Sequence, residues 1–232
     1  CSDVSGTGAA GTITTSNITI NGDLSDWTGV LATSSNYVTD LTLAQGDTDA
    51  IQSNNRDMTK FAYTYNSSHL FLYLKRVMNG QSQLGLVIYV DKNADGYMNS
   101  SDKAINFIWG GTTRKYDSAV YSYVPSNASG DLMGGNNFTM PGSITNGTSV
   151  DSNIIGGSLD GTELETQIPW SALGMSGPDG MKLKASSARG AATNLPSQVE
   201  DNVGGVLSAK NSFFLFQPDR SKPAKNSTSV YY

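Results

Sequence analysis

Short segments with apolar residues, either in a run or at every second position, recur along the chain between stretches rich in Gly, Asn, Asp and Ser. A buried strand reads as a short apolar run and a half-buried strand alternates, whereas a helix repeats its apolar positions every 3.6 residues. No stretch carries the helical period over the length of a helix, so we predict strands separated by turns. The predicted strands cover residues 12–20, 61–65, 70–76, 84–90, 103–109, 119–124, 163–168, 181–187 and 212–217, with weaker signals near Ile144 and over 149–155.

One short helical turn is predicted among these strands. Pro169 presets φ at its start and Gly174 stands at its end, the usual placing of these two residue types around a helix. Many short strands at spacings of about ten residues favour an all-β, antiparallel sandwich with long loops. We expect residues 1–11 to form a flexible tail, 12–220 a single domain, and 221–232 a second tail.

Charge and composition narrow the function classes. The chain has 20 acidic and 15 basic residues and a formal net charge of −5, which argues against nucleic-acid binding. Its only histidine, His69, leaves no choice of partners for a catalytic triad, and no motif points to paired catalytic carboxylates. We therefore expect a protein that is not an enzyme. No apolar run approaches the roughly eighteen residues that predict a transmembrane helix.

The clearest chemical signal lies between the predicted strands 84–90 and 103–109. It is the turn DKNADGYMNSSD, which carries side-chain oxygens at loop positions 1, 3, 5, 9 and 12 and a glycine at position 6. Calcium prefers six to eight hard oxygen ligands, and a glycine permits the sharp turn that gathers them around one ion. We predict a calcium site, most simply a structural one, whose donors are Asp91, Asn93, Asp95, the carbonyl of Tyr97, Asn99 and Asp102.

This turn resembles the calcium loop of dockerins, which also ends in an N-S-x-D run. It has Asp instead of Glu at position 12, and its flanks have the pattern of strands and not of helices, so neither the helix-loop-helix fold nor a cohesin partner is carried over. The alternative is a polar hairpin turn in which Asn and Asp serve only turn chemistry.

A second resemblance comes from the order of four motifs: ITINGDLSDW, LFLYLKRV, VIYVDKNADG and ELETQIPWSALG. This order, over about residues 13–220, is similar to that of the extracellular β-domains grouped with family 9 carbohydrate-binding modules and DOMON-like domains. The resemblance implies two antiparallel sheets of jelly-roll type, often with bound calcium. It does not fix a function, since such domains bind sugars, bind haem or build surfaces.

Each of the three tryptophans could either contact a ligand or fill the core. Trp27 and Trp170 fall in the motifs above, and we expect both to fill the core, because aromatic side chains bury large areas. Trp109 ends a predicted strand before two glycines. We expect it to pack in the core or at the sheet edge, with an exposed sugar platform as the alternative.

The N-terminus suggests a location. Cys1, the only cysteine, precedes the polar run SDVSGTGAAG, which resembles the mature end of a bacterial lipoprotein tethered to a membrane by a lipid on the cysteine. The alternative is an arbitrary start. A β-branched segment behind a flexible leader is also suited to strand addition on a neighbouring subunit, which would build a filament.

These expectations combine into one hypothesis: a non-enzymatic, calcium-stabilised protein of the cell surface, either a self-associating structural subunit or an adhesive lipoprotein. The alternative function is a carbohydrate-binding module acting on a surface glycan.

Overall fold

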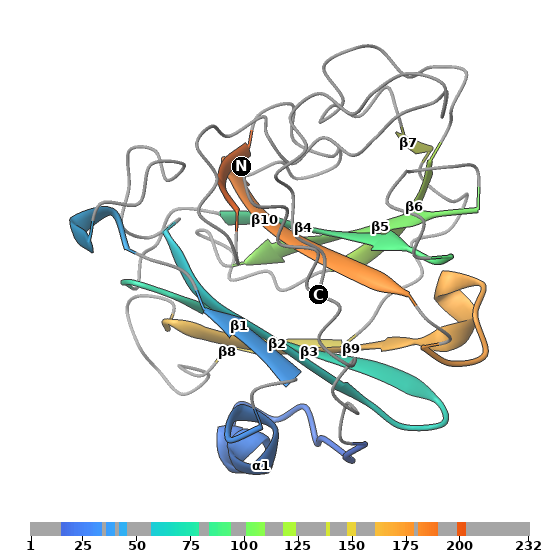
Figure 1. Ribbon diagram of the computed structural model, residues 1–232, viewed down its shortest axis with the longest axis horizontal. Coiled ribbons are helices and arrows are strands. Elements are labelled where there is room, and N and C mark those ends of the chain that lie inside the picture. Colours follow the sequence, from blue (N-terminus) through green and yellow to red (C-terminus); the bar gives the residue numbers. More distant parts are fainter. Residues whose placement is uncertain are drawn as a thin grey trace, which may run out of the picture.

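Two antiparallel sheets form the computed structural model of this protein, which describes residues 15–33, 36–39, 42–45, 57–78, 84–93, 101–109, 118–123, 138–139, 148–151, 161–178, 181–189 and 199–202. The five-stranded sheet has the order β1-β2-β3-β9-β8, and the six-stranded sheet has the order β11-β10-β4-β5-β6-β7. Every strand pairing is antiparallel. In Figure 1 the two sheets lie one above the other, and the short helix α1 lies on the outer side of the five-stranded sheet.

The strands are β1 Tyr37–Thr39, β2 Met58–Tyr65, β3 His69–Arg76, β4 Leu84–Asp91, β5 Lys103–Trp109, β6 Ser118–Tyr123, β7 Phe138–Thr139, β8 Thr148–Asp151, β9 Glu163–Pro169, β10 Lys182–Arg189 and β11 Val199–Asn202. The helical segments are η1 Leu24–Trp27, α1 Thr28–Leu31, η3 Leu43–Gln45 and η6 Trp170–Leu173. None of these helices is long and apolar enough to cross a membrane.

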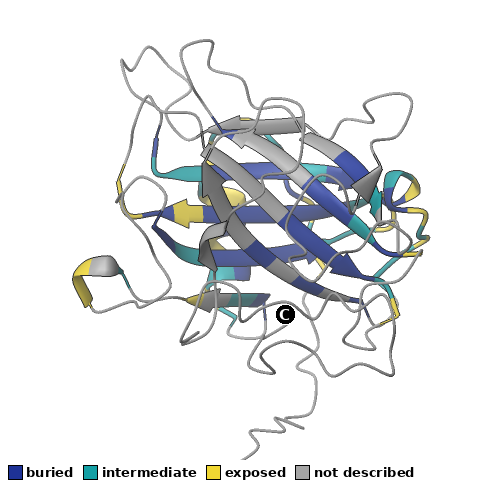
Figure 2. Cartoon of the chain, turned by 90° about the horizontal axis from the view of Figure 1, so that it is seen from above, coloured by how far each residue is buried: buried dark blue, intermediate teal, exposed yellow. Residues whose placement is uncertain are grey.

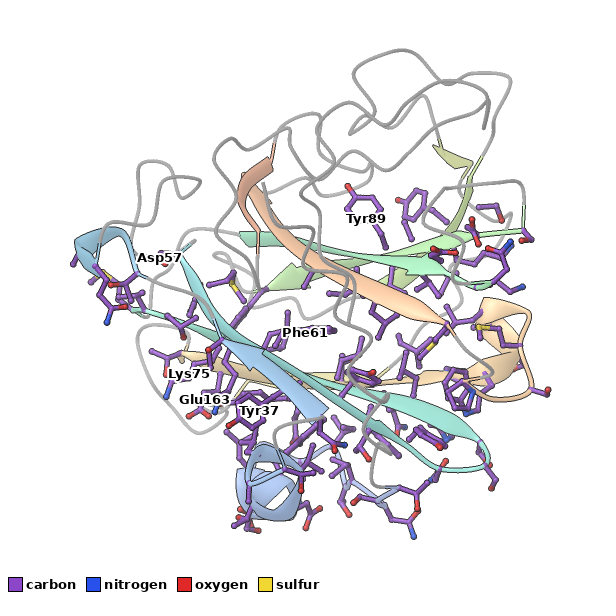
Figure 3. All side chains as sticks on the ribbon, viewed as in Figure 1. Tyr37, Asp57, Phe61, Lys75, Tyr89 and Glu163 are labelled. Carbon is purple, nitrogen blue, oxygen red and sulfur yellow. The ribbon has the colours of Figure 1, made fainter. Side chains whose placement is uncertain are left out.

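The core lies between the two sheets, as the alternating patterns predict. The larger apolar cluster joins Phe61, Leu72 and Leu164 of the five-stranded sheet to Ile88 and Leu183 of the six-stranded sheet. Figure 2 shows burial concentrated in the middle strands. In Figure 3 Phe61 points into the space between the sheets and Tyr89 points away from it, although Tyr89 is also fully buried.

Most of the predicted elements are confirmed. The hairpin β2–β3, the pair β4–β5, and strands β6, β9 and β10 lie where the patterns placed them, and β8 falls on a weaker signal. The predicted helical turn is η6, with Pro169 before it and Gly174 after it in the left-handed conformation, at φ 63°. The predictions for residues 1–14, 212–217 and 221–232 lie outside the described residues.

The predicted strand over residues 12–20 is wrong for its described part, 15–20, which has no strand structure. One backbone bond joins this segment to a strand, from Ser16 N–H to the carbonyl of Tyr65 (3.2 Å). The N–H of Thr19 instead donates to the carboxylate of Asp26 (2.9 Å). At Thr19, therefore, a side chain and not a neighbouring strand accepts the backbone hydrogen bond. The helical segments η1 and α1, and strands β1, β7 and β11, were not predicted.

Three buried tyrosines give a prediction for alkaline solution. Burial raises the pKa of Tyr63 to about 12, with the nearby Tyr65 adding to the effect. Burial also raises the pKa of Tyr73, where a hydrogen bond to Glu163 contributes, and that of Tyr89.

The unfolded chain ionises these phenols near their ordinary pKa of about 10, so above that pH it binds fewer protons than the folded chain. The free energy of unfolding should therefore fall as the pH rises above about 10. In a titration followed by phenolate absorbance, these three of the 11 tyrosines should ionise only as the chain unfolds. In urea all 11 should titrate together, and the same behaviour without urea would contradict the prediction.

Candidate functional site

The ends of the β4–β5 connection bring two acidic residues together. Val90 of β4 pairs with Lys103 of β5, so the next position of the register sets Asp91 against Asp102. Both side chains are fully buried. Asn93, the second predicted donor, is exposed at the start of the turn. The predicted donors Asp95, Tyr97 and Asn99 lie outside the described residues.

Lys92 links this turn to two other parts of the chain. Its backbone N–H donates to Asp102 Oδ1 (2.8 Å), which closes the base of the turn. Its amino group Nζ donates to the carbonyl of Gly174 (3.0 Å), directly after η6. Because η6 follows β9 of the five-stranded sheet, the Lys92 side chain fastens the turn of one sheet to the end of the other.

The second lysine at the turn, Lys103, is partly withdrawn from water. Burial lowers the pKa of its amino group, the positive charge of Lys92 lowers it further, and the carboxylate of Asp102 opposes both effects. Lys103 Nζ donates to Ser122 Oγ (2.8 Å) on β6. Both lysine amino groups therefore have hydrogen-bond partners away from the two carboxylates, Gly174 for one and Ser122 for the other.

The donor set fits a hard divalent cation. Burying a carboxylate is costly unless hydrogen bonds or positive charge compensate it. The bond from Lys92 N–H and the charge of Lys103 both favour the Asp102 carboxylate, and a cation between loop positions 1 and 12 would stabilise Asp91 and Asp102 further. Among the described residues no third acidic, histidine or cysteine side chain joins this pair, and the third carboxylate of the turn, Asp95, lies outside them.

Trp109, the candidate sugar platform, lies in the core. Its side chain is fully buried, and the guanidinium of Arg76 lies over its ring, 4.2 Å from the centroid. Arg76 is itself held by the carbonyl of Gly161, which accepts from Nε (3.0 Å) and Nη2 (2.8 Å). The ring face is therefore occupied from within the protein, which agrees with packing in the core and not with the alternative of an exposed stacking surface. Trp27 and Trp170 are also buried, as expected.

A second polar cluster was not predicted. Glu165 on β9 is fully buried on the outer face of the five-stranded sheet, where the N-terminal segment covers it. Its Oε1 accepts from the backbone N–H groups of Asn21 (2.8 Å) and Gly22 (2.6 Å), and its Oε2 accepts from the indole N–H of Trp27 (3.0 Å). Gly22 has a φ of 85°, a conformation that costs glycine little. We call Glu165 with these three donors the glutamate clamp.

The glutamate clamp joins two motifs that lie far apart in the sequence. NGDLSDW supplies the three N–H groups and ELETQIPW supplies the carboxylate, across 138 to 144 positions of the chain. Beside it, Ile18, Trp27 and Val30 pack on Phe71 and Tyr73 in a second apolar cluster. One feature of the sequence could have indicated the glutamate clamp. Glu165 lies in the middle of a predicted strand, and the chain contains only two other glutamates, at 163 and 200.

No family model, no curated protein and no solved structure matches this chain. The resemblances to family 9 carbohydrate-binding modules, DOMON-like domains and dockerin loops therefore stay predictions. What this protein does has to be inferred from its own residues.

Proposed function

We propose that this protein is a non-enzymatic, calcium-stabilised structural subunit of a cell surface, built as an antiparallel β-sandwich of jelly-roll type. In this proposal a calcium ion holds the β4–β5 turn, and the protein works through contacts with neighbouring subunits. Cys1 would carry the lipid that tethers it to a membrane.

The burial of two facing carboxylates, Asp91 and Asp102, carries the calcium part of the proposal. Turn chemistry accounts for the bond from Lys92 N–H to Asp102 Oδ1, but it does not require a second carboxylate, Asp91, to be buried beside it. Two carboxylates placed together out of water repel each other and lose hydration, and a divalent cation offsets both effects. The residues that would hold the ion are the two carboxylates with Asn93, Asp95, Asn99 and the carbonyl of Tyr97.

The edge of the five-stranded sheet supports the assembly part. Strand β1 pairs only with Lys60, Phe61 and Ala62 of β2, so the last residues of β2 extend beyond it. There Asn36 Nδ2 donates to the carbonyl of Tyr63 (3.1 Å), and Ser16 N–H donates to that of Tyr65 (3.2 Å). The N-terminal segment thus already meets a strand edge of its own domain. In an assembly, the residues before it would add to a strand edge of the next copy.

Sedimentation velocity and electron microscopy of the full chain in calcium test the assembly. We expect assemblies larger than a monomer. A variant that lacks residues 1–14 should be monomeric and keep its melting temperature, because it retains the Ser16–Tyr65 bond and the buried Ile18.

A full chain that stays monomeric with and without calcium would contradict the structural-subunit proposal. Calcium binding is tested independently, by titration calorimetry of the same protein. A full chain that binds calcium but does not assemble would therefore contradict only the structural-subunit part of the proposal.

A further inference from the structure

A groove of about 410 Å³ lies at one end of the five-stranded sheet, and none of the predicted calcium donors lines it. Three separate parts of the chain line it: the N-terminal segment with Asn17, the β2–β3 turn with Tyr65, Asn66 and Ser67, and the segment after η6 with Ser176 and Gly177. Its volume falls within the range of about 300–1,000 Å³ that is usual for small-molecule sites.

Hydrogen bonds fix the β2–β3 wall of the groove. Asn66 Oδ1 accepts from the N–H groups of Ser68 and His69 (both 2.8 Å), which closes the turn. The carbonyl of Asn66 accepts from the indole N–H of Trp170 (2.9 Å), and Ser68 carbonyl accepts from Trp170 N–H (3.0 Å). Two bonds to the buried Trp170 therefore hold this wall against η6.

The other two walls are tied to the same framework. Asn66 Nδ2 donates to Asn17 Oδ1 (3.0 Å), which attaches the N-terminal segment to the turn. After η6, Met175 N–H donates to the carbonyl of Trp170 (3.0 Å), which sets the course of the chain into Ser176 and Gly177. The groove is therefore formed by the fold before any ligand arrives, a condition that lowers the entropy cost of binding.

The lining groups offer hydrogen bonds without charge. Within the described part of the chain, the amide NH₂ of Asn17 and the hydroxyls of Ser67 and Ser176 make no hydrogen bond to another residue, and no lining side chain is charged. Tyr65 adds a half-buried ring, which Trp170 supports edge-on at 6.2 Å between ring centroids. The groove thus combines neutral donors and acceptors with one apolar surface.

We propose that this groove binds a neutral, hydroxyl-rich ligand, namely a sugar residue. The hydroxyl groups of the sugar pair with Asn17, Ser67 and Ser176, and its apolar C–H face packs on Tyr65. Anionic ligands find no cationic partner on these walls, and a purely apolar ligand would leave the polar groups unpaired. This site contains neither Trp109 nor any of the predicted calcium donors.

The test uses the full chain and a panel of neutral mono- and disaccharides, followed by titration calorimetry and saturation-transfer NMR. A tryptophan at position 177 should fill the groove, since a Cβ at Gly177 meets no atom within 4 Å. We expect Gly177→Trp to abolish sugar binding without lowering the melting temperature. Gly29→Trp is the matched control, because Gly29 has equally open surroundings on α1, and it should bind as the wild type does.

Removing single hydroxyls refines the test. Ser67→Ala and Ser176→Ala should each weaken binding roughly two- to tenfold, the worth of one hydrogen bond to a neutral group. Two results would overturn the proposal. One is that no neutral sugar of the panel binds the wild-type chain at millimolar concentration. The other is that binding survives unchanged in Gly177→Trp, which would place the ligand elsewhere.

Discussion

Replacing Glu165 by alanine should destabilise this protein by roughly 3–5 kcal/mol, because three N–H donors would lose their acceptor in a buried site. That is a large part of the 5–15 kcal/mol that keeps a typical domain folded. The expected result is a much lower midpoint in urea or thermal unfolding. Amide exchange should also become faster at Asn21 and Gly22, since the N-terminal segment would lose its anchor on the sheet.

Glu163→Ala is the matched control for this prediction. Glu163 lies two positions away on the same face of β9 and accepts a hydrogen bond from the hydroxyl of Tyr73, but it is only half-buried. Its loss should cost about 0.5–1.5 kcal/mol, the usual contribution of one hydrogen bond. If Glu165→Ala costs no more than Glu163→Ala, the glutamate clamp does not anchor the N-terminal segment.

Replacing Glu165 by glutamine tests the roles of the two carboxylate oxygens of the clamp separately. Its carbonyl oxygen can still accept from Asn21 and Gly22, but its amide NH₂ would face the indole N–H of Trp27, and two donors then oppose each other. We expect Glu165→Gln to be destabilising, though less so than Glu165→Ala. The informative second substitution is Trp27→Phe, because it removes the indole N–H and keeps an aromatic ring. Trp27→Asn or Trp27→Ala would instead leave a cavity in the core. The double variant should then lose less stability than the sum of the two single ones.

Removing calcium should lower the melting temperature by about 5–15 °C if the β4–β5 turn binds the ion in the micromolar range. At 1 mM calcium such a site stabilises the folded state by about 3–4 kcal/mol, since the ion binds the folded chain alone. Each kcal/mol corresponds to about 2–4 °C for a chain of this size. Thermal unfolding in calcium and in chelator measures the difference directly, and magnesium should restore little of it.

Variants of the two buried carboxylates make this prediction sharper. With calcium present, Asp91→Asn and Asp102→Asn should both be less stable than the wild type, because each weakens the ion's binding. In chelator Asp91→Asn should instead be more stable than the wild type, since it removes one of two buried charges that lie close together. Asp26→Asn, at an exposed carboxylate of the N-terminal segment, should keep the full calcium dependence. A wild-type melting temperature that does not respond to chelator would contradict the site.

Local apolar patterns by themselves determined the central strands of both sheets, but not β1, β7 and β11. Segments such as FAYTY and LFLYL are short runs of mostly apolar residues, which is a local property typical of buried strands. Their consecutive side chains are buried because the second sheet covers one face and the N-terminal segment covers the other. The turn DKNADGYMNSSD was also readable from its letters, because its Asp and Asn residues and its glycine have the spacing of a calcium loop between two strand patterns. The two ends of this turn, Asp91 and Asp102, come directly after and directly before the last pair of the β4–β5 ladder, Val90 and Lys103.

Only the tertiary structure decided what meets across long separations of the chain. The glutamate clamp, the bond from Lys92 to Gly174 and the groove beside Asn17 each join segments about 50 to 140 positions apart. The same holds for Trp109, whose sequence neighbours leave open whether its ring faces water or the guanidinium of Arg76. Local patterns fix which backbone conformation is favoured, but the partner of a side chain depends on how the sheets pack. Which side chains contact each other is therefore determined by burial and hydrogen bonding over the whole chain together.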